Sequence, residues 1–501
     1  MEVVCMSTMA TVMVIILSIM RIYFWKGPLN WPVVGMMPWL LWHLGNIYDQ
    51  SAKMVLENGK SFIARGPWFM RNTLFEVVTF SPDNLEYIMK ENFSNFPKGP
   101  YFKEVYFSTF GHGLFTSDDE LWKRQRKPAA MAVSSSKFRD RNLSLLQKAL
   151  QEKLLPFLEE VKEKKASVDL QHVLLQFSTD NIFLATLGRE ATSETFSSAF
   201  DEAIECCTYR FVCPSVIWKA MRFFNLGFEK RLRAAEAIVR DSVAEMVKAK
   251  VREVEQGNES QGDILSTFIK LEGDQGRTPP QHLLEGFTMS IFLAGKDTTA
   301  LAMSWFFWLI SMHPHVEEKI VSELSQILNS KHLSNVYDTV GVFGWEELRS
   351  MNYLQAALSE SMRLYPPVPA VFREAKIDNV LPDGTHVKKG TKCVLFIYAT
   401  NRMESIWGKD ALEFKPERWI TKEGICMNQS DYKYPVFIGG PRICIGKDFA
   451  YVNMKCIVAN ILARYRVKIE AGHQVKPKLG ATLFMKHGLK VTLHTRNGIL
   501  Q

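Results

Sequence analysis

A ten-residue, glycine-rich segment around one cysteine near the C-terminus limits what this chain can fold into more than any other feature. Residues 437–446 read FIGGPRICIG, and an apolar stretch with helical spacing follows from 449 to 462. Glycines allow a close backbone approach to a metal, and a sulfur just before a helix N-terminus is stabilised as a thiolate. The segment predicts that the Cys444 thiolate binds iron; the alternative is a buried structural cysteine beside a tight turn.

The composition is that of a large folded body. The chain has 501 residues, of which 47% are hydrophobic and 23% charged, so it can bury a large core. The net charge of +8 is spread along the sequence without a block of lysines or arginines, so we predict no nucleic-acid partner. The 8 cysteines include no CxxC pair, which indicates free thiols in a reducing compartment.

The N-terminus predicts a membrane anchor over residues 1–25. Residues 3–20 carry no charge, and apolar and aromatic residues continue at 22–25, which is about the length that crosses a bilayer as one helix. Arg21 and Lys26 predict that the chain continues on the cytosolic side. The alternative, a cleaved signal peptide, lacks a basic n-region and a small-residue cleavage site here. We therefore expect the lipid bilayer to be a partner.

The anchor is followed by a proline-rich linker over residues 26–38. It contains GPLNWPVVG and a further proline at position 38, and proline fixes φ and removes a backbone donor. The linker is therefore expected to be stiff and extended. The rest of the chain contains no internal repeat and no second linker of this kind, so we expect residues 39–501 to form one catalytic domain.

The periodicity of this domain predicts a mainly α body with small β-sheets. Apolar residues at three- and four-residue spacing predict helices over 142–165, 232–254, 286–311, 314–328 and 346–364. Short β-branched and aromatic runs predict strands over 74–79, 392–397 and 490–494. Pro382-Asp383-Gly384 is a turn signal typical of a strand edge.

The residues around Cys444 match a known pattern at every fixed position. The haem-binding loop of the cytochrome P-450 monooxygenases is F-x-x-G-x-R-x-C-x-G, and its fixed positions fall on Phe437, Gly440, Arg442, Cys444 and Gly446. The chain therefore resembles this family. The resemblance implies the cytochrome P-450 fold and a haem b whose iron takes the Cys444 thiolate as axial ligand. It also implies that Phe437, Arg442 and Gly446 lie against the haem.

Two further motifs of the family occur in the right order. Glu360 and Arg363 form its E-x-x-R helix, and FKPERW at 414–419 supplies the later Arg418. Opposite charges three residues apart share a helical face, and a second guanidinium completes the hydrogen bonds that buried charges require. We expect Glu360, Arg363 and Arg418 to have a structural role. Taken alone, the E-x-x-R spacing also occurs on solvated helix faces.

The helix around residues 286–311 is the second chemical centre. Lys296 and Asp297 would be costly in the middle of a bilayer, so a long core helix is expected here rather than a second membrane span. In the family this helix passes over the haem. The resemblance implies that Thr298 is the oxygen-activating hydroxyl and Asp297 its acidic partner in proton delivery. The alternative for Thr298 is a hydroxyl bonded back to its own helix.

A haem carries two propionates, so cationic and donor groups should gather at its edge. WKRQR at 122–126 resembles the W-x-x-x-R helix of the family, which offers the Trp122 indole and the Arg126 guanidinium about one turn apart. Arg442 and Arg373, just past a proline-rich turn at 366–369, are further candidates. The alternative for Arg373 is a surface arginine.

The resemblance also implies the source of electrons and the location. A monooxygenase of this kind inserts one oxygen atom of O2 into a C–H bond and needs electrons from NADPH. The sequence contains no G-x-G-x-x-G after a strand and no P-loop, so a separate NADPH–cytochrome P-450 reductase is expected as partner. We expect a single-pass protein of the endoplasmic reticulum membrane with a cytosolic catalytic domain.

Four segments narrow the resemblance to the plant fatty-acid ω-hydroxylases: residues 96–100, 294–310, 364–369 and 484–490. The implied substrate is hydrophobic, and ω-hydroxylation of long or very-long-chain fatty acids is expected. Mid-chain hydroxylation of alkanes and oxidation of a specialised plant metabolite are the alternatives. The chain departs from that group at Ile438-Gly439, at Lys296 and in a short stretch over 188–197, which leaves chain length and position open.

Two other classes of haem protein were considered. A haem-thiolate isomerase or dehydratase works without a reductase and is expected to lack the acid and threonine pair, which is present at Asp297 and Thr298. A non-enzymatic haem sensor needs neither that pair nor a long aromatic-rich body. Both classes are less consistent with the sequence than a monooxygenase.

Overall fold

The computed structural model describes residue 31 and residues 34–66, 77–190, 194–257, 262–331 and 343–496. The predicted anchor over 1–25 lies outside the described residues, as does most of the predicted linker. In the linker's described part, Trp31 and Gly35 exchange backbone hydrogen bonds, and a helix begins at Met37. Among the described residues, no helix combines the length and the apolarity that a bilayer span requires.

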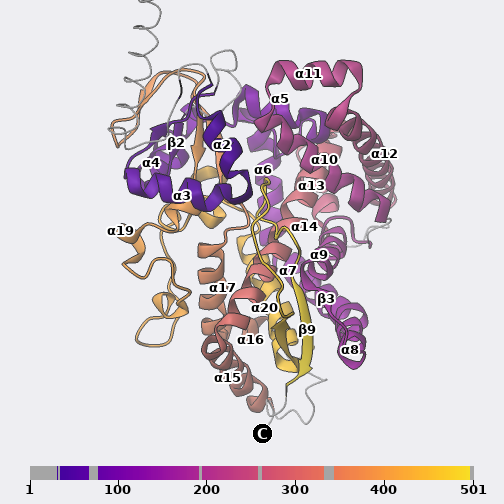
Figure 1. Cartoon of the computed structure of the whole chain (residues 1–501). Coiled ribbons are helices and arrows are strands. Elements are labelled where there is room, and N and C mark those ends of the chain that lie inside the picture. The colour runs from indigo at the N-terminus through magenta and orange to yellow at the C-terminus, as the bar shows by residue number, and fades with distance from the viewer. Residues whose placement is uncertain are drawn as a thin grey trace, which may run out of the picture.

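Helices make up most of the described chain (Figure 1). The first half contains α2 (Met37–His43), α3 (Ile47–Asn58), α4 (Pro82–Glu86), α5 (Gly99–Phe110), α6 (Asp119–Ser134), α7 (Ser136–Ala149), α8 (Leu155–Glu163), α9 (Leu170–Leu187), α10 (Glu194–Val212), α11 (Ser215–Phe224) and α12 (Gly227–Glu255). The second half contains α13 (Ile264–Gly273), α14 (Gln281–Met312), α15 (Pro314–Ser330), α16 (Trp345–Ser350), α17 (Asn352–Leu364), α18 (Ile397–Thr400), α19 (Glu404–Trp407) and α20 (Lys447–Arg464).

Three small sheets complete the fold. The strands are β1 (Phe62–Ile63), β2 (Val77–Thr79), β3 (Val168–Asp169), β4 (Val371–Glu374), β5 (Asn379–Val380), β6 (His386–Val387), β7 (Lys392–Leu395), β8 (Tyr465–Ile469) and β9 (Lys490–Thr495). The largest sheet has the order β1-β2-β7-β4, in which only the β2–β7 pair is parallel. Its β4 strand places Arg373 opposite Cys393 of β7. The other sheets are β3-β9-β8 and the β5–β6 pair.

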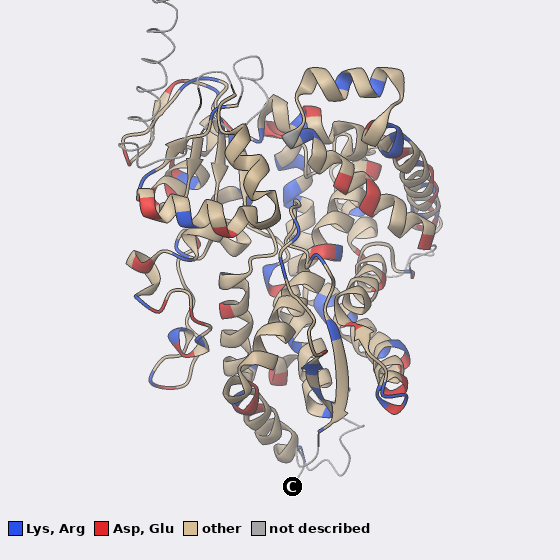
Figure 2. Ribbon diagram, in the orientation of Figure 1, with Lys and Arg blue, Asp and Glu red and all other residues tan. Residues whose placement is uncertain are grey.

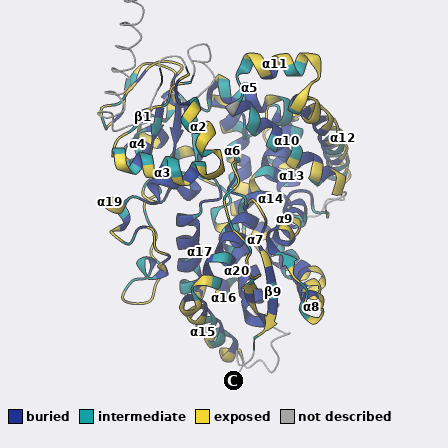
Figure 3. Ribbon diagram, in the orientation of Figure 1, coloured by how far each residue is buried: buried dark blue, intermediate teal, exposed yellow. Residues whose placement is uncertain are grey.

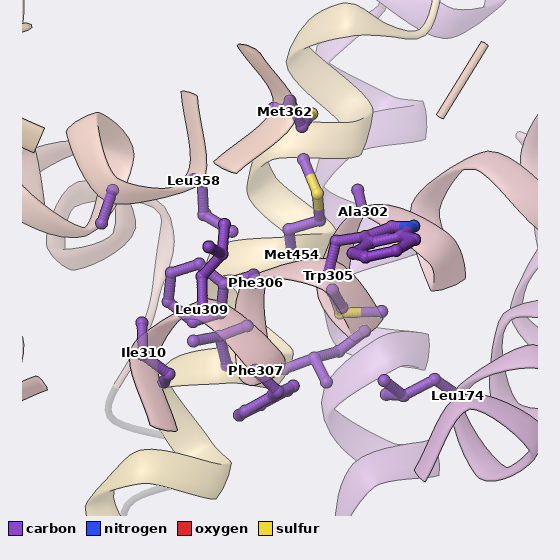
Figure 4. Close-up of a cluster of buried hydrophobic side chains, with 14 of the residues drawn as sticks. Leu174, Ala302, Trp305, Phe306, Phe307, Leu309, Ile310, Leu358, Met362 and Met454 are labelled. Atoms are coloured by element: carbon purple, nitrogen blue, oxygen red, sulfur yellow. The ribbon is translucent and has the colours of Figure 1, made fainter. Parts of the chain in front are cut away.

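The 32-residue helix α14 runs through the core. Its tryptophan and phenylalanine side chains at 305–307 meet Leu174 of α9, Leu358 and Met362 of α17 and Met454 of α20 (Figure 4). Figure 3 shows these central helices as mostly buried. Most charged residues lie instead on outer helices such as α8 and α12 (Figure 2). Burial of so much apolar surface along one helix fixes α14 as the axis around which the other helices pack.

The prediction of a mainly α body with small sheets is confirmed. The predicted strands at 392–397 and 490–494 correspond to β7 and β9, and the described part of 74–79 forms β2. The predicted helix over 142–165 exists, but a π turn at Leu150–Leu154 interrupts it. Pro156 follows that turn at the start of α8, and its missing backbone N–H explains why regular helical bonding is lost there.

The prediction of one helix over 346–364 is wrong, because the chain breaks into α16 and α17 at Met351. Met351 has a ψ of 78° and is fully buried. The Glu323 carboxylate of α15 accepts the backbone N–H groups of Tyr353 at 2.8 Å and of Leu354 at 3.0 Å. A carboxylate from another helix thus caps the start of α17, which sequence periodicity does not reveal.

Candidate active site

The loop that carries Cys444 is shaped by its glycines and by one backbone hydrogen bond. Gly440 has a φ of +66°, and a Cβ there would lie 2.0 Å from the Met89 carbonyl oxygen. Only glycine fits this conformation and this contact. The Cys444 N–H donates to the Phe437 carbonyl oxygen at 2.8 Å, which closes the loop just before α20 begins at Lys447.

The Cys444 thiol faces a space inside the protein. Its side chain is exposed, yet burial raises the pKa of the thiol, while a backbone hydrogen bond from Gly446 and the charge of Arg126 lower it. A side chain that is accessible but poorly hydrated lies in an internal cavity rather than on the outer surface. Gly446 lies directly beside the sulfur, because a Cβ at this position would be in van der Waals contact with the Cys444 Sγ, at 3.9 Å.

The other cysteines that the structure describes are less suited to bind a metal. Cys206, Cys207, Cys393 and Cys456 are buried. Burial raises the pKa of Cys207 and of Cys456 to about 12, so both stay as thiols. Among the described residues, no group of three or more histidine, cysteine or acidic side chains is arranged as a metal site. Among the described cysteines, Cys444 has the most accessible side chain.

Ile438 is strained within the same loop. It has a φ of +62° and a ψ of 170°, in a region that β-branched residues rarely adopt. The preceding Phe437 is buried, with its ring centre 5.3 Å from that of Tyr451.

Four of the predicted haem-edge residues have side chains close to one another or to the cysteine loop. Arg442 donates from Nη2 to Asp118 Oδ1 at 2.7 Å, and its guanidinium lies 4.5 Å from the ring centre of buried Trp122. Arg126, one turn further along α6, donates to the Ile443 carbonyl oxygen. Arg373 is only 3% exposed, which rules out the surface alternative. We call Trp122, Arg126, Arg373, Arg442 and Asp118 the haem-edge cluster.

The haem-edge cluster has more positive charge than the described protein neutralises. Asp118 forms an ion pair with Arg442, while the Nε atoms of Arg373 and Arg442 are buried and have no hydrogen-bond partner. Burial and the charge of Arg442 lower the pKa of Arg373 to about 9. Buried donors of this kind require an anion, and two propionate groups supply it. The cluster and the Cys444 thiol therefore fit a haem.

The middle of α14 shows where the cavity meets this helix. Ala294 is exposed and Leu293 and Gly295 are partly exposed, although most of the helix is buried. The Thr298 hydroxyl donates to the Ala294 carbonyl oxygen at 2.6 Å, which is the back-bonded geometry of the alternative interpretation. That bond uses the hydroxyl proton and leaves the oxygen able to accept another hydrogen bond.

Asp297 is 2% exposed and does not pair with Thr298. Its carboxylate accepts a hydrogen bond from Lys296 Nζ at 3.1 Å, and the same ammonium pairs with Asp201 of α10. Burial opposes the charge of Lys296, but the two carboxylates raise its pKa. The Lys296 ammonium therefore stays charged and fixes the position of the Asp297 carboxylate.

Glu360, Arg363 and Arg418 form a closed network in the structure. Arg363 binds both Glu360 oxygens, at 2.7 and 2.9 Å, and Arg418 Nε donates to Glu360 Oε1 at 2.8 Å. The remaining Arg363 donors reach the carbonyl oxygens of 401, 411 and 413 at 2.6 to 3.1 Å. Trp419 Nε1 also donates to Glu360, at 2.9 Å. The network connects α17 to residues 401–419, which precede the cysteine loop.

Sequence reasoning missed Lys98 and Asp118. The Asp118 carboxylate accepts the backbone N–H groups of Lys98 at 2.9 Å and of Gly99 at 3.2 Å, in addition to Arg442. An aspartate just before a helix is typical of a helix cap, and this pattern could have drawn attention to Asp118. Its carboxylate does not cap α6, however. Residues 96–100 entered the sequence analysis only as a segment of the family resemblance, and no role was expected for Lys98.

The described geometry defines a haem-thiolate protein: one accessible thiolate ligand before a helix, a cationic edge for two propionates, and an acid and a hydroxyl on the helix that borders the cavity. The family model for cytochrome P450 matches residues 26–494. The chain belongs to the cytochrome P450 family and is a monooxygenase that binds haem iron through a thiolate.

Relatives with this architecture come from plants. The chain is 42% identical to Cytochrome P450 86B1 of Arabidopsis thaliana over 94% of its length and 86% of the relative's. It is 34% identical to Alkane hydroxylase MAH1 of Arabidopsis thaliana, over 93% and 92% of the two chains. It is also 34% identical to Noroxomaritidine synthase 2 of Narcissus pseudonarcissus, over 94% and 91%.

Proposed function

We propose that this enzyme hydroxylates the ω position of long or very-long-chain fatty acids. Apolar side chains near Cys444 and on α14 that are only partly buried carry this proposal. Leu293 of α14 and Phe115 and Phe372 from other segments are partly buried and pack against one cluster. Ile445, directly after Cys444, packs against the same cluster. Such a wall accepts a long alkyl chain through burial of apolar surface.

Mid-chain hydroxylation of an alkane is the second candidate. It is supported by the likeness to a relative named as an alkane hydroxylase, over 93% of this chain. Both candidates bring an unactivated C–H bond to the same centre. They differ in whether the far end of the chain carries a carboxylate, and this difference is directly measurable.

The bound haem supplies activation of dioxygen, which electron donation from a thiolate ligand favours. The chain's own residues provide the ligand, the orientation and the protons. Cys444 would supply the thiolate ligand, and the haem-edge cluster would hold the two haem propionates. Thr298 Oγ1 presents a hydrogen-bonding group at the accessible face of α14. Asp297 is the acidic group that we assign to proton delivery; in this structure its carboxylate pairs with Lys296 and not with Thr298.

Electrons come from NADPH through a separate NADPH–cytochrome P-450 reductase. Lys123 and Lys127 are exposed on α6, the helix whose Arg126 contacts the cysteine loop. A basic surface close to the thiolate side of the haem suits an acidic redox partner. We therefore propose that the reductase binds the side of α6 that faces solvent.

The enzyme is placed at the endoplasmic reticulum membrane, anchored by residues 1–25, with the catalytic domain in the cytosol. Helix α11 supports contact with a bilayer, because Val216 is 77%, Phe223 80% and Phe224 66% exposed (Figure 3). Trp42 of α2 is 86% exposed. Exposed apolar side chains on a helix that also carries Lys219 and Arg222 are typical of an interfacial helix.

Co-expression with a plant reductase tests the function. Membranes are given NADPH and a mixture of fatty acids and alkanes, and the products are identified by mass spectrometry. We expect ω-hydroxy fatty acids that disappear without reductase or in a Cys444→Ala control. Mid-chain alcohols of alkanes instead would select the second candidate. Products that form without reductase, or only from non-lipid substrates, would overturn the proposal.

A further inference from the structure

A hollow in the protein surface lies between the start of α3, the second half of α14 and the segment 475–477. Its volume is about 310 Å³, and the rings of Trp305, Trp308 and Tyr365 form one wall. The described residues that line it include neither Cys444 nor any member of the haem-edge cluster. The hydroxylation reaction therefore gives this hollow no role.

The aromatic wall is held rigidly. The rings of Trp305 and Tyr365 stack with their centres 4.2 Å apart, and the Trp308 ring is nearly perpendicular to both, at 5.5 and 5.3 Å. Trp305 is buried in the core (Figure 4), and its Nε1 donates to the Leu483 carbonyl oxygen at 2.7 Å. Trp308 and Tyr365 are only partly buried and face the hollow. Aromatic surface of this kind attracts an organic cation.

The hollow also has one charged side chain of each sign. Asp49 Oδ1 accepts the Tyr398 hydroxyl, whereas no described residue bonds to Oδ2 or forms an ion pair with this carboxylate. The Lys476 ammonium is exposed and has no ion pair or hydrogen bond with a described residue. Arg402 is buried over the Tyr398 ring at 3.4 Å and does not line the hollow. A ligand with one positive and one negative group therefore matches this hollow.

The walls of the hollow are fixed before any ligand binds. The Tyr48 hydroxyl of α3 donates to the Gly480 carbonyl oxygen at 2.8 Å and accepts the Gly480 N–H at 3.1 Å. These bonds hold α3 against the segment that follows residue 477. A preformed site of this kind costs little ordering entropy on binding.

An apolar surface directly precedes the hollow in the sequence. Leu41, Trp42 and Leu44 are exposed, and the next residue, Gly45, lines the hollow. Figure 3 shows exposed residues along α2, which carries Leu41 and Trp42. An apolar surface beside a polar hollow matches the boundary between acyl chains and headgroups in a bilayer.

We propose that this hollow binds the phosphocholine headgroup of a bilayer lipid. The trimethylammonium group lies against Trp308 and Tyr365 and is balanced by Asp49. The phosphate is bound by Lys476 and by the Trp308 indole N–H, which has no acceptor among the described residues. The proposal rests on the proposed contact of α2 with the membrane, but not on which lipid the enzyme hydroxylates.

The first test measures which lipid the full-length, haem-loaded protein retains from nanodiscs with equal amounts of phosphatidylcholine and phosphatidylglycerol of the same acyl chains. Native mass spectrometry gives the ratio of the two bound lipids, and the wild-type protein should retain phosphatidylcholine in excess. Asp49→Asn should lower this ratio about tenfold, because it removes the charge that balances the ammonium. Glu57→Gln, which changes an exposed carboxylate of the same helix, is the matched control and should change the ratio by less than about twofold.

Lys476→Met should reduce retention of both lipids by a similar factor, because both carry the phosphate. Lys486→Met is its control: the Lys486 N–H donates to the Lys476 carbonyl oxygen, but Lys486 does not line the hollow. The carbon monoxide spectrum of each variant checks that it is folded with its haem. A wild-type protein without excess phosphatidylcholine, or equal ratios for Asp49→Asn and Glu57→Gln, would overturn the proposal.

The second test separates the headgroup from the bilayer. Soluble glycerophosphocholine and choline are each added to the full-length holoenzyme in a detergent without phosphocholine, and saturation-transfer NMR of the N-methyl protons reports contact. The glycerophosphocholine signal should fall about threefold in Trp308→Leu, and choline should give a weaker signal than glycerophosphocholine. An unchanged signal in Trp308→Leu would overturn the aromatic site, and equal signals from the two ligands would overturn the phosphate contact. Neither readout needs turnover, so a failure of the hydroxylation proposal leaves both results unchanged.

Discussion

Two groups of buried charges in this protein are built in opposite ways. In the network around Glu360, both carboxylate oxygens and the Arg363 donors are bound by protein groups at 2.6 to 3.1 Å. In the haem-edge cluster, the Nε atoms of Arg373 and Arg442 are buried without a partner. The first group is complete within the described chain, whereas the second is complete only with an added anion.

This difference separates structure from function. A satisfied buried network contributes to the fold, and removing one partner leaves an uncompensated charge. An unsatisfied cationic cluster opposes the fold of the protein without cofactor and favours cofactor binding. Substitutions in the Glu360 network should therefore destabilise the protein without haem more than substitutions in the haem-edge cluster do.

The largest effect is expected for Arg363→Met. The substitution leaves Glu360 charged and buried, so the free energy of unfolding should fall by about 3–5 kcal/mol, with or without haem. Urea unfolding of both forms measures this. Arg349→Met is the control, because Arg349 is an exposed arginine on the neighbouring α16. Equal stability of the two variants would show that the network is not structural.

A smaller effect of a different kind is expected for Arg442→Met. It removes a propionate partner, so haem binding should weaken by about 1.5–3 kcal/mol. The free energy of unfolding of the haem-free protein should fall by less than it does in Arg363→Met, because Asp118 keeps Lys103 and two backbone N–H groups as partners and repulsion with Arg373 is relieved. Haem transfer rates measure the change in haem binding, and urea unfolding of the haem-free form measures the change in its free energy of unfolding. If haem-free Arg442→Met lost as much free energy of unfolding as haem-free Arg363→Met, the contrast between the two groups would be wrong.

The pH dependence of the haem-free protein should differ between the groups. Burial and Arg442 lower the pKa of Arg373 to about 9, so above that pH the unfolded state binds more protons than the folded state. The unfolding free energy of the haem-free form should therefore rise by about 1 kcal/mol between pH 8 and pH 10. Arg373→Met should abolish this rise. A fall in unfolding free energy over the same range would contradict it.

The Glu360 network should not respond over that pH range. Burial opposes the charge of Arg418, but Glu360 raises the pKa of Arg418. The stability that this arginine contributes is therefore fully present below the pKa that arginine has in the unfolded chain.

Arg418→Lys is expected to lower the free energy of unfolding by about 1 kcal/mol, the smallest of the predicted losses, because an ammonium replaces part of a forked contact at the edge of the network. Thermal unfolding at pH 7 measures it. A loss as large as that of Arg363→Met would show that both arginines are equally essential.

Much of the fold followed from the sequence because its signals are local. The spacing of apolar residues predicted α14, α15 and α20, and short β-branched runs predicted β7 and β9. The break at Met351 was missed because Glu323, on another helix, determines it. Local patterns report which element forms, whereas long-range caps decide where it ends.

The site was predictable to the extent that fixed spacing encodes it. Cys444 and the Glu360 network follow from motifs, and the structure brings the network residues together as expected. Asp297 and Thr298 were expected to act as a pair. In the structure the Asp297 carboxylate pairs with Lys296, whereas the Thr298 hydroxyl donates to the Ala294 carbonyl oxygen. The contacts of Asp118 with Arg442 and with the Lys98 N–H were not predicted, because these residues meet only in the folded protein.

The most direct test of the account is the carbon monoxide spectrum of the reduced, haem-loaded protein. The wild-type protein should give the Soret band that is typical of thiolate ligation. Cys444→Ser should lose that band, and Cys456→Ser, which alters a buried cysteine of the following helix, should keep it. A wild-type spectrum typical of imidazole or water ligation, or a thiolate band that survives in Cys444→Ser, would contradict the claim that Cys444 binds the haem iron.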